Sequence, residues 1–424
     1  MTRLAGRGRS LRRRACGTLL VGAIFGAFAP SAGASTGWTR EFGSGAPDVV
    51  RSVAVDATGI YVAGATRSKL PFGTWAGAWD GFVRKYSLSG RLLWTDQFGT
   101  AGQDGAADVT TDGSNVYVVG WTGGSGPLPD YATSVNRNPG RAILRSYRTD
   151  GTLDWSRTFG PTGTAALSVV ATGFEPIVAG VTAGTFLGQH SSGGQDAFVA
   201  TFDPNAGHLG SLAQFGTAAA DEAEGVAYRQ GGYYVSGDTA GTLGPRSYGG
   251  VDGFVRKYHF DGSELWTRQF GTSGNDYAPA IGLRDDLYVA GESSPGVRGV
   301  DSSSYVRSFT RGGAQTWSES FGTPEGTSAY DLTLGPDAVS VTGRTFGTLP
   351  GQTPGGGADA FVHTVGLDGS NPSDVQIGTS EWDVGRGIGG GLTGTLAIGG
   401  STSGTFPGER FHGGGIDAFL TELG

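Results

Sequence analysis

Short hydrophobic runs that end in glycine recur along the chain. Residues 60–64 read IYVAG and are followed by Thr66, and residues 116–120 read VYVVG and are followed by Thr122. Runs this short, rich in Val, Ile and Tyr and bounded by glycine, are typical of β-strands rather than helices. The pattern occurs seven times, which predicts a repeated all-β unit. Its glycines are Gly64, Gly120, Gly180, Gly237, Gly291, Gly343 and Gly400.

Two further motifs repeat with a period of about 56 residues. A Phe-Gly pair begins at Phe42, Phe98, Phe159, Phe215, Phe270 and Phe321, with Ile377-Gly378 as a degenerate seventh copy. An Asp-(Ala/Gly)-Phe-(Val/Leu) motif begins at Asp80, Asp196, Asp252, Asp359 and Asp417. In the first unit we expect strands at 52–56, 60–65, 81–87 and 91–98. Seven units of four short strands predict an all-β fold, a seven-bladed β-propeller with antiparallel blades.

The two ends of the chain favour a closed ring over an open stack of units. The last unit stops at Gly424, after its third predicted strand. A spare copy of the fourth strand, from Trp38 to Phe42, lies at the other end of the chain. We therefore expect this segment to complete the last blade, because closing the ring removes exposed strand edges.

The order of the motifs supports a family resemblance. The chain reads FGT-x-G-x-D, then VYVAG-x-T, then GG-x-DAFV, then DG-x-x-x-W. This order resembles the SBBP-type repeat of seven-bladed β-propellers, and the resemblance covers nearly all of residues 35–424. It implies the propeller fold and a secreted or surface protein. It implies no reaction or cofactor, because one fold carries many functions.

The first 34 residues differ from the repeats. They contain six arginines and no acidic residue, then an apolar stretch from Ala15 to Ala29, then Ala32-Gly33-Ala34. This order is typical of a secretory signal peptide with a small-residue cleavage site. We therefore expect a signal peptide at 1–34, one propeller domain at 35–424, and a secreted or cell-surface protein. An uncleaved membrane anchor is the alternative, and the choice between Sec and twin-arginine export stays open.

Composition and charge limit the classes of partner that we expect for this protein. Glycine supplies 80 of 424 residues, which disfavours helices because each interior glycine costs a helix about 1 kcal/mol. The net charge is −8, and without the six leader arginines it becomes 24 − 38 = −14. Such acidity disfavours nucleic acid and anionic membranes as partners. The single cysteine, Cys16, lies in the leader, so we expect no disulfide. We expect a monomer without cofactor or metal.

Strand direction alternates within a blade, so the longer loops gather on one face, here called the long-loop face. An Asp lies six residues after the Phe in five units and precedes the innermost predicted strand. We expect these carboxylates to form a polar ring at the central channel. The alternative is that each accepts backbone N–H bonds within its own turn. The five are Asp48, Asp104, Asp221, Asp276 and Asp383.

Four tryptophans break the repeat pattern, and we expect them on the long-loop face or at its edge. A tryptophan ring combines a flat apolar face with an N–H donor, which suits sugar rings. The irregular loop of the second unit adds three polar or aromatic candidates. The alternative is that the rings pack over glycine-rich backbone. The predicted binding sector comprises Trp75, Trp79, Trp121, Trp382, Tyr131, Arg137 and Arg141.

No motif predicts a reaction. The five histidines fall at different repeat positions and lack zinc-site spacing, so we predict no catalytic residues. We favour a secreted, non-enzymatic binding or scaffold domain that recognises an extracellular glycan or protein through the long-loop face. One alternative is a carbohydrate-active enzyme, a lyase or glycosidase, that uses carboxylates of this face. A second alternative is a purely structural surface domain.

Overall fold

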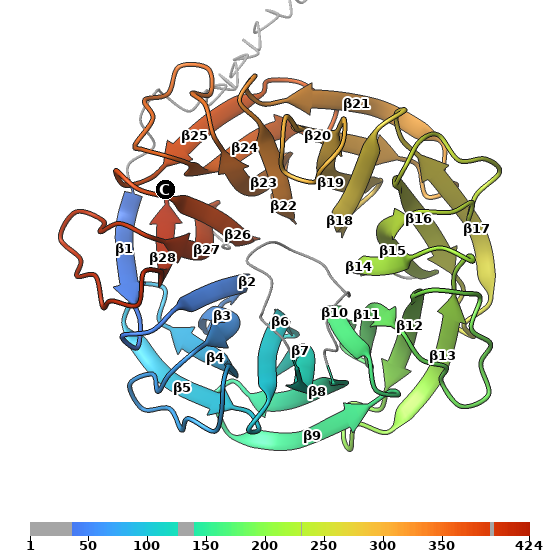
Figure 1. The fold of residues 1–424 in the computed structure, drawn as a ribbon, viewed down its shortest axis with the longest axis horizontal. Helices are drawn as coiled ribbons and strands as arrows, with labels where there is room; N and C mark the ends of the chain where they lie inside the picture. Colours follow the sequence, from blue (N-terminus) through green and yellow to red (C-terminus); the bar gives the residue numbers. More distant parts are fainter. Residues whose placement is uncertain (1–35, 126–139, 230, 391–393) are drawn as a thin grey trace, which may run out of the picture. The chain divides into compact units, whose positions relative to one another are not determined.

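Seven antiparallel four-stranded sheets surround a central channel (Figure 1). The computed structural model describes residues 36–125, 140–229, 231–390 and 394–424. The predicted seven-bladed β-propeller is therefore confirmed. Residues 1–34, the predicted signal peptide, lie outside the described residues. None of the described residues belongs to a helix long and apolar enough to cross a membrane.

Each blade runs in chain order from the channel outward. The innermost strands are β2 (Asp48–Asp56), β6 (Gln103–Thr111), β10 (Thr164–Ala171), β14 (Asp221–Arg229), β18 (Asn275–Leu283), β22 (Thr327–Leu334) and β26 (Asp383–Gly390). The second strands are β3 (Gly59–Thr66), β7 (Asn115–Gly124), β11 (Pro176–Thr182), β15 (Gly232–Thr239), β19 (Leu287–Ser294), β23 (Ala338–Thr345) and β27 (Leu396–Thr402). The third strands are β4 (Asp80–Tyr86), β8 (Arg141–Arg148), β12 (Asp196–Phe202), β16 (Asp252–Tyr258), β20 (Ser303–Phe309), β24 (Asp359–Gly366) and β28 (Asp417–Leu423). The outermost strands are β5 (Leu92–Phe98), β9 (Leu153–Phe159), β13 (Leu209–Phe215), β17 (Glu264–Phe270), β21 (Gln315–Phe321), β25 (Ser373–Ile377) and β1 (Thr36–Phe42).

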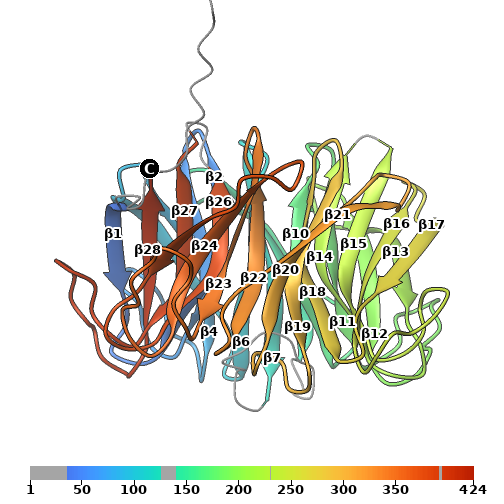
Figure 2. The same cartoon turned by 90° about the horizontal axis from the view of Figure 1, so that it is seen from above.

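The last blade combines both ends of the propeller. Strand β1 pairs antiparallel with β28, with Arg40 opposite Leu420 and Phe42 opposite Ala418. Figure 2 shows β1 and β28 side by side, running between the two faces of the ring. The prediction that the segment from Trp38 to Phe42 closes the last blade is confirmed. We number the blades 1 to 7 from β2–β5 to the closing blade.

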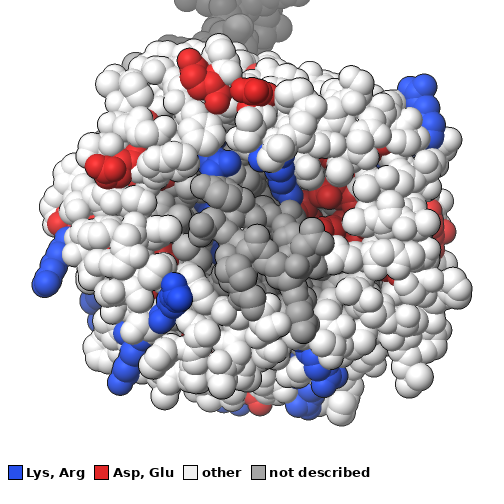
Figure 3. All heavy atoms as spheres, in the orientation of Figure 1, with Lys and Arg blue, Asp and Glu red and all other residues white. Residues whose placement is uncertain are grey.

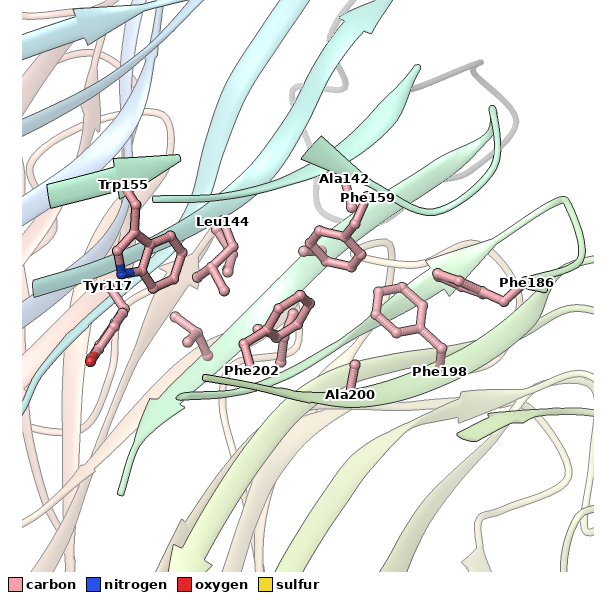
Figure 4. Packing of buried hydrophobic residues seen from close by; sticks show 13 residues of the cluster. Tyr117, Ala142, Leu144, Trp155, Phe159, Phe186, Phe198, Ala200 and Phe202 are labelled. Carbon is pink, nitrogen blue, oxygen red and sulfur yellow. The ribbon is translucent and has the colours of Figure 1, made fainter. Parts of the chain in front are cut away.

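The hydrophobic core is divided into layers between neighbouring blades. A cluster of buried hydrophobic residues lies at each of the seven blade junctions. At the junction of blades 2 and 3, Phe159 of β9 packs against Phe198 and Phe202 of β12, with ring centroids 6.0 and 4.8 Å apart (Figure 4). Burying one such side chain stabilises the fold by about 2–3 kcal/mol. The repeated Phe therefore joins one blade to the next.

The residue after this Phe is glycine because an Asp carboxylate lies too close to its backbone for a side chain to fit. A Cβ atom at Gly99 would come within 2.4 Å of Asp80 Oδ1, and one at Gly271 within 2.4 Å of Asp252 Oδ1. The glycine of the Phe-Gly motif, at the end of one strand, therefore makes room for the carboxylate of the Asp motif at the start of the neighbouring strand. This contact explains why both motifs recur with the same period.

Every innermost strand contains a β-bulge, which the sequence pattern did not predict. In β2 the pairing with β3 shifts between Val50 and Ser52, and corresponding shifts occur in the other six blades. An extra residue at a bulge interrupts the alternation of inward and outward side chains, so the sequence pattern shows only the part of the strand after the bulge. Strand β2 therefore begins at Asp48 rather than at the predicted Ser52.

The residue after the bulge links adjacent blades at the channel. Asp108 of β6 accepts hydrogen bonds from Ser52 Oγ at 2.6 Å, from its neighbour Val109 N at 2.8 Å, and from Val169 N at 2.8 Å. Ser168 Oγ donates a fourth bond at 3.1 Å. Asp331 of β22 accepts from Leu332 N at 2.8 Å and from Ile388 N of blade 7 at 2.9 Å. Side chains in the channel wall thus hold consecutive blades together.

Candidate functional site

The β3–β4 loop of blade 1 is held on the long-loop face by two polar side chains. Gln97 Oε1 accepts a hydrogen bond from Leu70 N at 3.0 Å, and Gln97 Nε2 donates to Asp80 Oδ2 at 2.9 Å. Asp80 Oδ2 also accepts from Ala76 N at 2.8 Å, and Leu70 is buried beneath the loop. The loop is therefore fixed at Leu70 and at Ala76, and the residues between them project outward.

Phe72 occupies a turn position that three other blades give to glycine. Six residues after the Thr that ends the second strand, blades 3, 6 and 7 have Gly188, Gly351 and Gly408, with φ of 79°, 73° and 83°. Phe72 follows Thr66 by the same six residues and has φ of 67°. A left-handed conformation costs a non-glycine residue about 1–2 kcal/mol. The Phe72 side chain is nevertheless 85% exposed.

Trp75 follows in the same loop and is 53% exposed. Trp79, at the base of the loop, is half-buried, and its carbonyl accepts a hydrogen bond from Asp104 N at 3.0 Å. Blade 1 thus presents Phe72 and Trp75 as two exposed aromatic side chains, here called the aromatic loop. The sequence prediction contained Trp75 and Trp79 but missed Phe72. The sequence feature that could have identified Phe72 is its position, which is occupied by glycine in blades 3, 6 and 7.

The other predicted tryptophans lie elsewhere. Trp382 is 45% exposed and stands edge-on to Phe346 of the β23–β24 loop, at the junction of blades 6 and 7. Trp121 is only 7% exposed and packs with Ala165 and Val181 between blades 2 and 3. Its ring fills the space above Gly105, where a Cβ atom would lie 2.5 Å away. The structure therefore places Trp121 inside a blade junction, apart from the aromatic loop.

Of the three candidates in the irregular second-unit loop, one is described. Arg141 is exposed at the start of β8, and its Nε donates a hydrogen bond to the carbonyl of Gly160 at 2.8 Å. Tyr131 and Arg137 lie outside the described residues. Their part in a binding sector stays a prediction.

The five repeated aspartates lie at the inner ends of the blades with no exposed surface. Asp104 Oδ2 accepts hydrogen bonds from Thr100 N at 2.8 Å and Thr100 Oγ1 at 2.9 Å, and Asp104 Oδ1 accepts from Gly123 N at 3.0 Å. Asp48 accepts from Ser44 N at 2.7 Å, and burial raises the pKa of Asp48 to about 6. Asp221, Asp276 and Asp383 accept bonds from the corresponding Thr residues. These carboxylates fasten turns inside the blades and do not line the channel surface.

A charged cluster lies at the same register as Trp121, in blades 4 and 5. The cross-strand pair there is Glu222 opposite Asp238 in blade 4, and Tyr277 opposite Glu292 in blade 5. The corresponding pairs in blades 1, 2, 3 and 7 carry no charge: Val49 and Ala65, Gly105 and Trp121, Ala165 and Val181, and Val384 and Ser401. Sequence reasoning missed this cluster. Acidic side chains at a register that is uncharged in four blades, and that carries Ser328 opposite Arg344 in blade 6, were the signal available.

Arg298, from the β19–β20 loop, lies within this cluster. Its Nη1 is 3.3 Å from Glu224 Oε1, its Nε is 3.2 Å from Glu292 Oε1, and its guanidinium lies 4.3 Å from the Tyr277 ring centroid. Burial, together with the charge of Glu224, raises the pKa of Glu222 to about 8. Burial also raises the pKa of Asp238 well above its ordinary value. In the residues that the structure describes, no group of three or more His, Cys, Asp or Glu side chains is arranged to hold a metal ion.

Comparisons with known proteins support the fold. The WD40 domain of Pan2 from Neurospora crassa superposes with a TM-score of 0.52 at 11% identity, covering 89% of each chain. The WD40 propeller of Doa1 also gives a TM-score of 0.52, at 12% identity, covering 92% of this chain and 96% of that one. Likeness at this identity shows the β-propeller fold alone.

One curated protein is similar in sequence. Regulatory protein FlaEY of Caulobacter vibrioides is 26% identical over 342 residues, which cover 74% of this chain. The match spans only 31% of that protein, so this chain corresponds to about a third of its length. The chain matches no family model.

Proposed function

We propose that this protein is a secreted, non-enzymatic β-propeller of the SBBP-repeat type that binds an extracellular glycan through the aromatic loop of blade 1. The observation that carries the proposal is Phe72, a bulky residue in the left-handed region with an 85% exposed side chain. Backbone strain of this kind clusters at functional sites. The basic and apolar leader before residue 34 supports secretion.

The chemistry of the loop favours a sugar over a flat protein surface. Phe72 and Trp75 stand three residues apart on a loop fixed at both ends, so they present apolar ring faces without ordering a flexible segment. Stacking of ring faces on the C–H face of a pyranose uses this kind of surface. Both rings project among polar loops, where an apolar patch is typical of a binding site.

The experiment is a glycan array probed with the purified protein, followed by calorimetry with the glycan that it identifies. We expect Trp75→Ala and Phe72→Gly each to weaken binding at least tenfold, about 1.4 kcal/mol. Phe174→Ala is the matched control, because Phe174 is 79% exposed in the β10–β11 turn on the opposite face. Absence of binding to any glycan by the folded protein would contradict the proposal, as would an equal loss in the Phe174 variant.

The strain at Phe72 predicts a stability effect of the opposite sign. Phe72→Gly should raise the free energy of unfolding by about 1 kcal/mol, because glycine adopts positive φ without steric cost. Chemical denaturation measures this difference. The reciprocal change in blade 3, Gly188→Phe, should lower stability by a similar amount, since Gly188 has φ of 79° and open space around its Cβ position. A Phe72→Gly variant that is less stable than wild type would show that the ring holds the loop in place.

A further inference from the structure

The charged cluster of blades 4 and 5 contains more negative groups than positive ones. Four carboxylates belong to it, and Arg298 is the cation among them. Arg298 contacts Glu224 and Glu292, and its charge also acts on Glu222 and Asp238, so four carboxyl groups share this cation. We call this group the acidic cluster: Glu222, Glu224, Asp238, Glu292 and Arg298.

Glu222 is the side chain that the fold leaves unused. It is only 8% exposed, and it has no hydrogen-bond partner among the described residues. One oxygen of Asp238 and one of Glu292 are likewise buried without a hydrogen-bond partner in the described part of the chain. Burying a carboxyl group without partners costs several kcal/mol. Such a group, at a register that four other blades fill with uncharged pairs and blade 6 with Ser328 and Arg344, indicates that something outside the fold uses it.

The acidic cluster lies at the long-loop end of its blades, where Glu222 and Asp238 are each 8% exposed. Figure 3 shows the long-loop face, with acidic side chains gathered beside the centre on the side where Figure 1 places β14 and β15. Glu222 is the second residue of β14 and Asp238 the last but one of β15, so both lie at the long-loop end of blade 4. The nearby β19–β20 loop adds an apolar rim, with Val297 72% and Val300 54% exposed.

Arg298 indicates the chemistry that the cluster accepts. Its guanidinium is held by two carboxylates and an aromatic ring face, which is a typical environment for an organic cation. We propose that Glu222 and Asp238 bind a second organic cation, the ammonium or guanidinium group of a ligand, with its alkyl stem on Val297 and Val300. A metal ion fits less well, because the described carboxylates do not converge on one point. This inference is independent of the aromatic loop.

Binding of a cation should release a proton from the cluster. Burial holds the pKa of Glu222 at about 8, so without ligand this carboxyl group is mostly protonated at neutral pH. The groups facing it are Glu224 on its own strand, Asp238 on β15, and Arg298, with Tyr277 and Glu292 behind Arg298. A bound cation favours the charged carboxylate. Affinity should therefore rise as the pH increases from 6 to 9.

The test is calorimetry on the full-length protein with four probes: N-acetyl-lysine amide, N-acetyl-arginine amide, uncharged N-acetyl-norleucine amide, and 1,5-diaminopentane. We expect saturable binding of the charged probes, none of the norleucine probe, and proton uptake by the buffer. Tighter binding of the diamine would identify a free amine as the ligand. Tighter binding of an amino-acid amide would identify a basic side chain of a peptide.

Variants make the result specific. Glu222→Gln should weaken binding of the charged probes at least tenfold and abolish proton release, and Asp238→Asn should weaken binding as well. Glu325→Gln is the control, because Glu325 is an exposed carboxylate in the β21–β22 loop of the same face. Neither change in the cluster should impair folding, since each replaces a buried carboxyl group with an uncharged amide of the same size. Absence of saturable binding by the wild-type protein would overturn the inference, as would unchanged binding by Glu222→Gln.

Discussion

Asp108→Ala is expected to lower the free energy of unfolding by about 3 kcal/mol. The carboxylate of Asp108 accepts four hydrogen bonds and joins blades 1, 2 and 3 at the channel. Alanine would leave Val169 N and two serine hydroxyls without this acceptor, while Val109 N would keep Ser52 Oγ at 3.2 Å. Each buried unpaired group costs about 1–3 kcal/mol. Burial raises the pKa of Asp108, so part of the gain from the four bonds is already offset in the wild type. Denaturant unfolding measures the difference.

Asp331→Ala is the matched comparison for this prediction. Asp331 occupies the same register in blade 6, but among the described residues it accepts bonds from just two groups, both backbone N–H groups. We therefore expect about half the loss of stability. A cost below about 0.5 kcal/mol for Asp108→Ala, the usual range for surface changes, would show that water replaces the carboxylate in the channel.

Glu41→Gln is expected to stabilise the closing blade by about 1–2 kcal/mol at pH 8. Four blades have Gln before the repeated Phe-Gly or Ile-Gly pair, and its amide donates to the Asp motif, as Gln376 Nε2 does to Asp359 Oδ2 at 2.6 Å. In the closing blade this position is Glu41. It accepts from Phe406 N at 3.1 Å but, when ionised, repels the carboxylate of Asp417. Glutamine restores the missing donor.

The pH dependence of this effect has a definite sign. Burial, with the charges of Asp417 and Glu409, raises the pKa of Glu41 from 4.5 to about 7 in the folded protein. The folded state therefore binds this proton more tightly than the unfolded state, and the wild type loses stability as the pH rises from about 4.5 to 7. The full shift corresponds to about 3 kcal/mol, which solvent near the rim reduces.

Thermal unfolding between pH 4 and 8 tests this prediction. Wild type and Glu41→Gln should unfold together near pH 4 and separate by about 2 °C at pH 8. The reciprocal variant Gln97→Glu places the same carboxyl group beside Asp80 in blade 1 and should introduce the same pH-dependent loss. A Glu41→Gln variant that is less stable at pH 8 would show that the carboxylate contributes to ring closure.

The amino-acid sequence by itself determined the number of blades, the four strands of each and the strand that closes the ring. These features follow from local rules: hydrophobic alternation, glycine at turns, and a repeat that each blade must satisfy to pack on the next. Phe159 and Gly99 illustrate this, because each contact that they make recurs around the ring. A pattern that occurs seven times in the sequence identifies the repeated blade without a structure.

Only the tertiary structure decided which residues that break the pattern reach the surface. Trp121 and Trp75 look equivalent as departures from the repeat, yet one fills the space above Gly105 and the other projects into solvent. The acidic cluster needs Glu222 and Arg298, which lie 76 positions apart in two different blades. Side-chain exposure and charge pairing depend on which blades become neighbours and on bulges that redirect side chains, and neither is a property of a single repeat.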